Sequence, residues 1–177
     1  WQSNNLRAYK LGQNGNEATD QDGNELWNTP LSEEHRIEIL SHIEKLISVL
    51  PEKPNEAWDP IEDRGAQITF SPIGNTAPVE IKMSYDTDRK KRDALLTQVP
   101  FEDGSVEVKI GGTTCLDYFE KGKNKGYNIL KLIRHMDWDI NECIYFGDSL
   151  FPGGNDETVI GIIDTVAVQN HRHTHDI

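Results

Sequence analysis

The run Gly147-Asp148-Ser149-Leu150-Phe151-Pro152-Gly153-Gly154-Asn155-Asp156 constrains the fold of this chain more than any other segment. It follows an apolar run, Cys143–Phe146, that predicts a buried strand. A strand that ends in Gly-Asp places the carboxylate at the edge where open α/β sheets bind ligands. The glycines let the backbone turn back to Asn155 and Asp156. Two groups of oxygen ligands at one edge suit Mg²⁺, whereas the simpler interpretation is a polar turn with Asn155 capping a helix.

Two earlier blocks, Ile61–Gly74 and Gly111–Tyr127, precede this run. The three blocks, in this order, resemble the haloacid dehalogenase superfamily, most closely its sugar-phosphate branch of Cof-type phosphatases and eukaryotic-type phosphomannomutases. The Gly-Asp and Asn-Asp pairs match the last motif of that superfamily. The lysine before Gly126-Tyr127 matches the penultimate motif. The resemblance extends from about Trp58 to Val168.

The order of predicted elements, with this resemblance, implies an α/β fold: the C-terminal half of a Rossmann-like haloacid dehalogenase core plus an α+β cap with an antiparallel sheet. We expect a hairpin segment from the core edge over residues 1–28, the cap over 29–117 and the C-terminal half of the core over 118–177. The predicted helices are Glu33–Leu50, capped by Ser32; about Thr87–Gln98, capped by Asp86; Gly126–Met136; and a short Asp156–Ile162. The predicted strands are Leu6–Lys10, Glu25–Asn28, Ala66–Ser71, Val106–Ile110, Leu116–Phe119, Cys143–Phe146 and Thr165–Val168.

The resemblance also implies roles for particular residues. Lys125 would hold the phosphate as a point charge in phosphoryl transfer; its alternative is an exposed lysine at the start of a helix. Asp148, Asn155 and Asp156 would bind Mg²⁺ or lie next to it.

The implied substrate residues lie in the predicted cap. Arg64 aligns with an arginine that meets the distal phosphate or sugar in phosphomannomutases, and Asp117 would accept hydrogen bonds from sugar hydroxyls. The alternative for both residues is an ordinary position at the surface, without a role in substrate binding. Asn75 and Lys82 stand where phosphomannomutases carry arginines. Losing these bidentate groups weakens the mutase interpretation, since a mutase must bind two phosphates in alternation.

The first motif of the superfamily, Asp-x-Asp-Gly-Thr, supplies the aspartate nucleophile and has no good copy here. Asp20-Gln21-Asp22-Gly23-Asn24 has similar letters, but the polar residues before it cannot form a buried strand. Asp22-Gly23 instead favours a hairpin turn. We therefore expect the chain to be a fragment without the nucleophile, inactive by itself.

Composition limits the partners. A net charge of −12 over 177 residues argues against nonspecific nucleic-acid binding, and no run approaches the roughly 18 apolar residues of a membrane helix. We expect the basic run Arg89–Arg92 to be a solvated face. Cys115 and Cys143 look like small buried hydrophobes, and with no secretory signal visible we expect a cytoplasmic location. A homodimer, or association with the missing N-terminal part, stays open.

The function that these features favour is Mg²⁺-dependent phosphoryl transfer on a sugar phosphate by a phosphatase-like hydrolase. Phosphomannomutase is the alternative within the same chemistry. A third alternative, from a different class, is a noncatalytic ligand-binding or regulatory module that keeps the site without a nucleophile.

Overall fold

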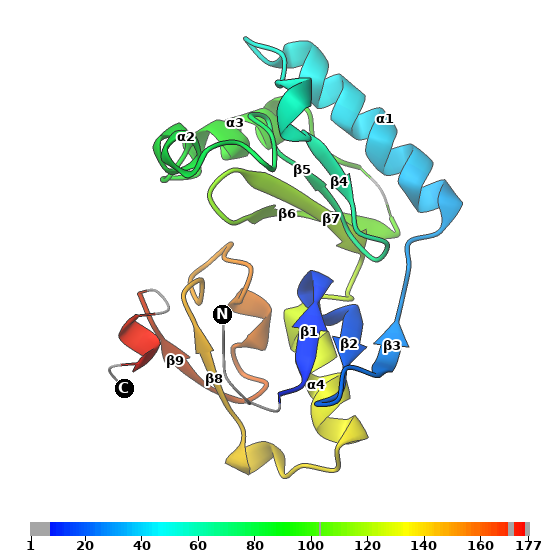
Figure 1. Cartoon of the computed structure of the whole chain (residues 1–177), viewed down its shortest axis with the longest axis vertical. Helices are drawn as coiled ribbons and strands as arrows, with labels where there is room; N and C mark the ends of the chain where they lie inside the picture. Colours follow the sequence, from blue (N-terminus) through cyan, green and yellow to red (C-terminus); the bar gives the residue numbers. More distant parts are fainter. Residues whose placement is uncertain (1–7, 103, 170–171, 176–177) are drawn as a thin grey trace.

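The computed structural model describes residues 8–102, 104–169 and 172–175. Figure 1 shows two parts: three helices and a four-stranded sheet above, and the remaining strands with one helix below. Among the described residues the strands form three sheets. No helix in these ranges is long and apolar enough to cross a membrane.

The first sheet is antiparallel and lies in the lower part. It contains β1 (Lys10–Gly12), β2 (Glu17–Thr19) and β3 (Glu25–Asn28), with the 3-10 turn η1 (Gln13–Gly15) between β1 and β2. The expected hairpin turn at Asp20–Asn24 is confirmed, although it joins β3 to β2 and not to β1. The Asp20 carboxylate accepts hydrogen bonds from the amides of Asp22 and Asn24. Of the predicted strand Leu6–Lys10, Leu6 and Arg7 lie outside the described residues.

The upper part packs helices on one face of an antiparallel sheet ordered β4-β5-β7-β6. These strands are β4 (Ile61–Asp63), β5 (Ile68–Phe70), β6 (Val106–Gly111) and β7 (Cys115–Glu120), and the turn η2 (Glu56–Trp58) precedes them. Helix α1 (Glu33–Val49) begins as predicted, because the Ser32 side chain accepts a hydrogen bond from the His35 amide. Apolar side chains of α1, α3 and the sheet form the core of this part.

The segment after β5 differs from the prediction of one helix over Thr87–Gln98. Two helices flank Asp86 instead: α2 (Val79–Tyr85) and α3 (Lys90–Gln98). Asp86 is buried, and its carboxylate accepts hydrogen bonds from the amides of Lys91 and Arg92. The expectation of a solvated basic face is wrong for Arg92, which is fully buried against that carboxylate.

Helix α4 (Lys125–His135) crosses the lower part beside a parallel pair, β8 (Ile144–Gly147) and β9 (Asp164–Ala167). The turns η3 (Ile140–Glu142), η4 (Glu157–Val159) and η5 (His173–His175) complete this part. The short helix expected at Asp156–Ile162 is thus a single 3-10 turn.

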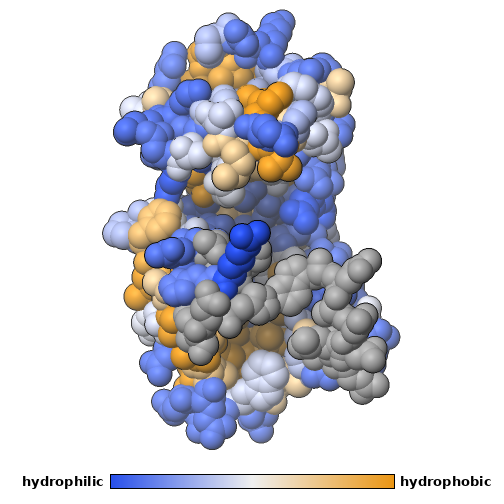
Figure 2. All heavy atoms as spheres, turned by 60° about the vertical axis from the view of Figure 1, so that its left-hand side comes forward, coloured by the Kyte–Doolittle hydropathy of each residue, from blue (hydrophilic) through white to orange (hydrophobic). Residues whose placement is uncertain are grey.

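Strand β8 is not buried as the sequence predicts. Ile144 is 55% exposed and Phe146 is 38% exposed, because within the described residues β8 pairs with β9 on one side only. In the space-filling view of Figure 2 most of the visible surface is hydrophilic, with small hydrophobic patches.

Two further expectations concern the cysteines and the domain boundary. Cys115 and Cys143 are both free and half-buried, so neither is the fully buried hydrophobe that the sequence suggests. The boundary expected after residue 117 falls within β7, which continues to Glu120. The division of the chain into three segments stays a prediction.

Candidate active site

The start of α4 and the loop after β8 meet in a buried ion pair. Nζ of Lys125 lies 2.5 Å from Oδ1 of Asp156, whose side chain is nearly fully buried. The Tyr145 hydroxyl donates to the same oxygen at 2.7 Å, and the Ser149 amide donates to Oδ2 at 3.1 Å. Burial raises the pKa of Asp156, but the hydrogen bonds from Lys125 and Tyr145 outweigh it, so the net pKa is below its usual value. Asp156 is therefore held as a carboxylate that fixes the Lys125 ammonium.

Three glycines permit this close packing. A Cβ on Gly147 would lie 2.7 Å from Oδ2 of Asp156, and one on Gly154 would lie 2.0 Å from the Ser149 carbonyl oxygen. A Cβ on Gly126 would lie 2.0 Å from the Thr158 carbonyl oxygen, where the start of α4 meets η4. The glycines of the sequence motifs are thus required by close approach of the backbone.

Two further oxygen-bearing residues lie on the same loop. Asp148 is exposed, and its carboxylate accepts a hydrogen bond from the Ser149 hydroxyl at 3.2 Å. Oδ1 of Asn155 is buried and has no hydrogen-bond partner. An unsatisfied carbonyl-type oxygen and an exposed carboxylate on one loop are the kinds of ligand that a hard cation such as Mg²⁺ prefers. The donors are too few for a complete site, since the described residues contain no group of three His, Cys, Asp or Glu that could hold a metal.

On the cap sheet, Asp117 faces away from the helices. Its β7 neighbours Leu116 and Tyr118 belong to the core cluster, and alternation places Asp117 on the opposite face. The Thr69 hydroxyl donates to Oδ1 of Asp117 at 2.8 Å. The pKa of Asp117 is above its usual value, because the effect of burial outweighs the Thr69 hydrogen bond and the charges of Arg64 and Lys125, which act to lower it. The charge of Lys125, which lies in the lower part, therefore acts on this cap carboxyl.

The remaining predicted substrate residues form a separate group. The Asn75 side-chain amide donates to the Asp59 carbonyl at 2.9 Å, and Nζ of Lys82 donates to the Asn75 carbonyl at 2.8 Å. The Cys115 thiol donates to Oδ1 of Asn75 at 3.5 Å, and burial raises the pKa of that thiol. These side chains are engaged with each other and with the backbone. Arg64 is exposed in the turn after β4, where its Nε lies 3.8 Å from Oε1 of Glu62.

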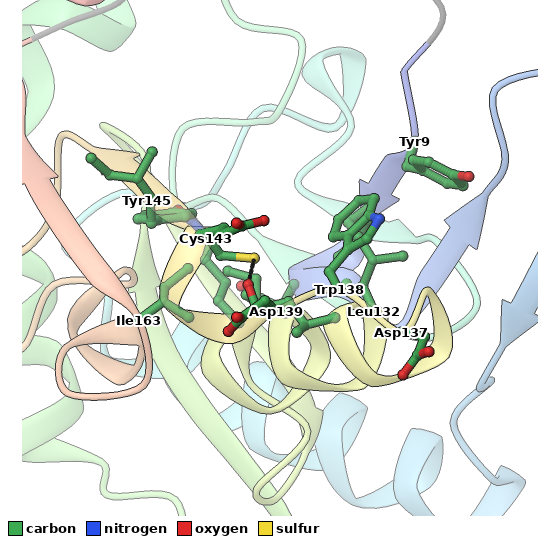
Figure 3. A pocket seen from close by; sticks show the side chains of 16 residues that line it. Tyr9, Leu132, Asp137, Trp138, Asp139, Cys143, Tyr145 and Ile163 are labelled. Carbon is green, nitrogen blue, oxygen red and sulfur yellow. Dashed lines mark hydrogen bonds between the residues drawn. The ribbon is translucent and has the colours of Figure 1, made fainter.

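A cavity of about 890 Å³ adjoins the Lys125 side of this site (Figure 3). Lys125 and Tyr145 line it, together with apolar side chains of α4 and residues near the start of β8. Tyr9 and Trp138 meet edge-to-face in its wall, with ring centroids 5.7 Å apart. The cavity thus joins the ion pair to the region along β8.

Sequence reasoning did not identify two contributors to this site. Tyr145 lies two residues before Gly147, so the alternation of a strand could have placed it on the same face as the glycine. Thr69 is opposite Asp117 in the β5–β7 register, which no local pattern in the sequence reveals.

Comparison with known proteins agrees with this arrangement. A model of the eukaryotic phosphomannomutase family matches residues 2–175. The phosphomannomutase of Encephalitozoon cuniculi is 30% identical over 153 residues, which cover 83% of this chain and 54% of that protein. The phosphomannomutase of Spinacia oleracea is 31% identical over 141 residues, which cover 77% of this chain and 54% of that protein. The chain therefore spans about half the length of the curated relatives that it matches.

The fold has a counterpart among solved structures. A sugar phosphatase of haloacid dehalogenase subclass IIB superposes with a TM-score of 0.55 at 18% identity, covering 90% of this chain and 63% of that one. At this identity the likeness concerns the fold alone. It confirms the mixed α/β architecture with an antiparallel sheet that the sequence predicts.

Proposed function

The chain belongs to the eukaryotic phosphomannomutase family, and we propose that it forms part of an enzyme that transfers phosphoryl groups on a sugar phosphate. The observation that carries the proposal is the position of Lys125. Asp156 fixes this ammonium at the end of β8, and its charge acts on Asp117 of the cap sheet. A cation held between the two parts suits a phosphate group whose sugar contacts the cap.

In this proposal Lys125 binds the phosphate, and Asp156 positions Lys125. This differs from the role that the resemblance implies for Asp156, because its two carboxylate oxygens already accept three hydrogen bonds. Asp148 and the unsatisfied Oδ1 of Asn155 would hold Mg²⁺. The bound ion would neutralise charge on the phosphate oxygens.

The cap would select the sugar. Asp117 and Arg64 are the groups proposed to contact the sugar, since Asp117 lies on the face of the cap sheet opposite the helices and Arg64 is exposed in the turn after β4. Asn75 and Lys82 are less available, because each already makes hydrogen bonds within the cap.

Two reactions fit this site. Asn75 stands where phosphomannomutases carry an arginine, and its amide is engaged with Asp59, which favours hydrolysis with a single phosphate site. Membership of the family favours phosphomannomutase as the second candidate.

Isothermal titration of the full chain with mannose 6-phosphate and Mg²⁺ tests the proposal. We expect Lys125→Met to weaken binding about tenfold or more, because a charged hydrogen bond to phosphate is lost. The matched control is Lys121→Met, which removes an exposed lysine just before α4. Absence of binding to the wild-type chain, or equal loss in both variants, would contradict the proposal.

Turnover separates the classes of function. Phosphate release would indicate a phosphatase, and conversion of mannose 1-phosphate to mannose 6-phosphate would indicate a mutase. Binding without either reaction agrees with both the noncatalytic module and the predicted lack of the nucleophile, so only turnover separates the classes.

A further inference from the structure

Arg89 extends from the cap to the loop that carries the proposed metal ligands. It lies between α2 and α3 in the upper part. The Cζ atom of its guanidinium is 5.7 Å from the ring centroid of Phe151. Its Nη2 lies 3.4 Å from the position that a Cβ on Gly153 would occupy. The cation–π contact joins the two parts of the chain at the loop between Asp148 and Asp156, and the guanidinium ends close to Gly153 of that loop.

Among the described residues, no carboxylate pairs with the Arg89 guanidinium. Its neighbours in the basic run pair locally, Lys90 with Asp88 and Arg92 with Asp86. Within the described residues no ion pair is found for Arg89, and its buried Nε has no hydrogen-bond partner. The described partner of this guanidinium is therefore the Phe151 ring.

The backbone of Arg89 is held in a disfavoured conformation. Its φ of +66° is left-handed, which residues with a Cβ adopt reluctantly. The Arg89 amide donates to the Asp86 carbonyl, and its carbonyl accepts from the Asp93 amide. Such conformations persist where the surroundings determine them, and here the turn aims the side chain at the loop.

The loop is also anchored from the core side. The Gly153 amide donates to Oε2 of Glu157 at 2.9 Å, so a hydrogen bond holds the same loop in which Arg89 contacts Phe151. Asn155, with its unsatisfied Oδ1, follows two residues later.

We propose that Arg89 is a positioning residue that holds the cap against the Phe151–Gly153 loop through a cation–π contact. The contact keeps the cap closed beside the loop and limits motion of the segment that carries Asp148 and Asn155. The role of this contact in catalysis rests on the proposed function, whereas the role of the contact in holding the loop does not.

Hydrogen exchange of the full chain, followed in peptides that cover residues 148–156, tests this role. Arg89→Gly removes the side chain and keeps the left-handed turn without strain. We expect the loop amides to exchange about two- to fivefold faster, as loss of a partly exposed cation–π contact implies. Phe151→Leu should produce the same change, and the double variant should exceed neither single variant. Lys90→Ala, which removes an adjacent exposed charge, is the control and should match the wild type.

Unchanged loop exchange in Arg89→Gly, or additive effects in the double variant, would overturn the proposal. If exchange also rises in β6 and β7, Arg89→Lys decides: partial protection of the loop supports the contact, and a rate equal to that of Arg89→Gly overturns it. Titration with mannose 6-phosphate and Mg²⁺ keeps the two proposals apart. If Arg89→Gly shows the faster exchange but the wild-type chain binds no sugar phosphate, only the proposed function is contradicted.

Discussion

Asp156 occupies the position of a metal ligand in sequence but accepts donors from three elements in the structure. Lys125 at the start of α4, Tyr145 on β8 and the Ser149 amide all donate to it. The motif predicts where this carboxylate lies. It does not reveal that the carboxylate already accepts three hydrogen bonds, because Lys125 is 31 positions away in the chain.

Removing the charge of Asp156 should destabilise the fold. Asp156→Asn leaves the Lys125 ammonium without its counter-ion, and we expect the free energy of unfolding to fall by about 1–3 kcal/mol. Asp148→Asn, on the same loop but exposed, should change it by less than about 0.5 kcal/mol. Urea denaturation of both variants provides the measurement. Equal stabilities would show that the buried pair contributes nothing to folding.

His42 should make the stability of the cap depend on pH. Its Nε2 donates to the Val99 carbonyl, and in the neutral ring its Nδ1 accepts from the Tyr118 hydroxyl. Burial lowers the pKa of His42 below its usual value of 6.5. Below about pH 6.5 the unfolded chain therefore binds more protons than the folded one, and stability falls as the pH drops, by at most about 1.4 kcal/mol per unit.

Urea midpoints at pH 7 and pH 5.5 measure this dependence. We expect His42→Gln to reduce the difference between the two midpoints, whereas His135→Gln, an exposed histidine on α4, should preserve it. If the pH dependence of stability were unchanged in His42→Gln, other titratable groups would be responsible for it.

At the scale of elements, the sequence predicts helices with clear caps and periodicity well. Helix α1 begins at Glu33 after Ser32, as expected, and α4 begins within one residue of its prediction. The segment around Asp86 differs in two ways: α3 begins at Lys90 and not at Thr87, and the sequence does not predict α2 before Asp86. The residues next to Arg92 in the sequence do not indicate that it is buried. The carbonyl groups that accept its hydrogen bonds belong to Gly111 and Gly112, on the β6–β7 hairpin.

Arg92 should be essential to the junction of α3 with the β6–β7 hairpin. Its guanidinium donates to Asp86 and to the carbonyls of Gly111 and Gly112. We expect Arg92→Met to lower the free energy of unfolding by about 3–5 kcal/mol, because the buried Asp86 carboxylate loses its partner. Lys90→Met, an exposed neighbour, is the control. Thermal denaturation by circular dichroism measures both, and similar melting temperatures would mean that Asp86 does not depend on Arg92.

At the scale of the whole molecule, the candidate site is divided between two parts. The start of α4 supplies Lys125, the loop after β8 supplies Asp156, and the cap sheet supplies Asp117. The resemblance identifies these residues individually. How the parts meet depends on contacts that no motif contains, such as the hydrogen bond from Asn14 to Gln67 and that from the Ala66 amide to Gln13.

This division predicts that the two parts contribute differently to binding. Asp117→Asn should weaken mannose 6-phosphate binding about tenfold, because an amide replaces the carboxylate that would accept from sugar hydroxyls, yet it should leave inorganic phosphate binding unchanged. Lys125→Met should weaken both ligands, since it removes the cation that faces the phosphate. The control is Asp93→Asn, which makes the same charge change on α3, over the other face of the cap sheet. Isothermal titration with each ligand in the presence of Mg²⁺ measures the effects. If Asp117→Asn weakened both ligands equally, the cap carboxyl would act through the electrostatics of Lys125 and not through recognition of the sugar.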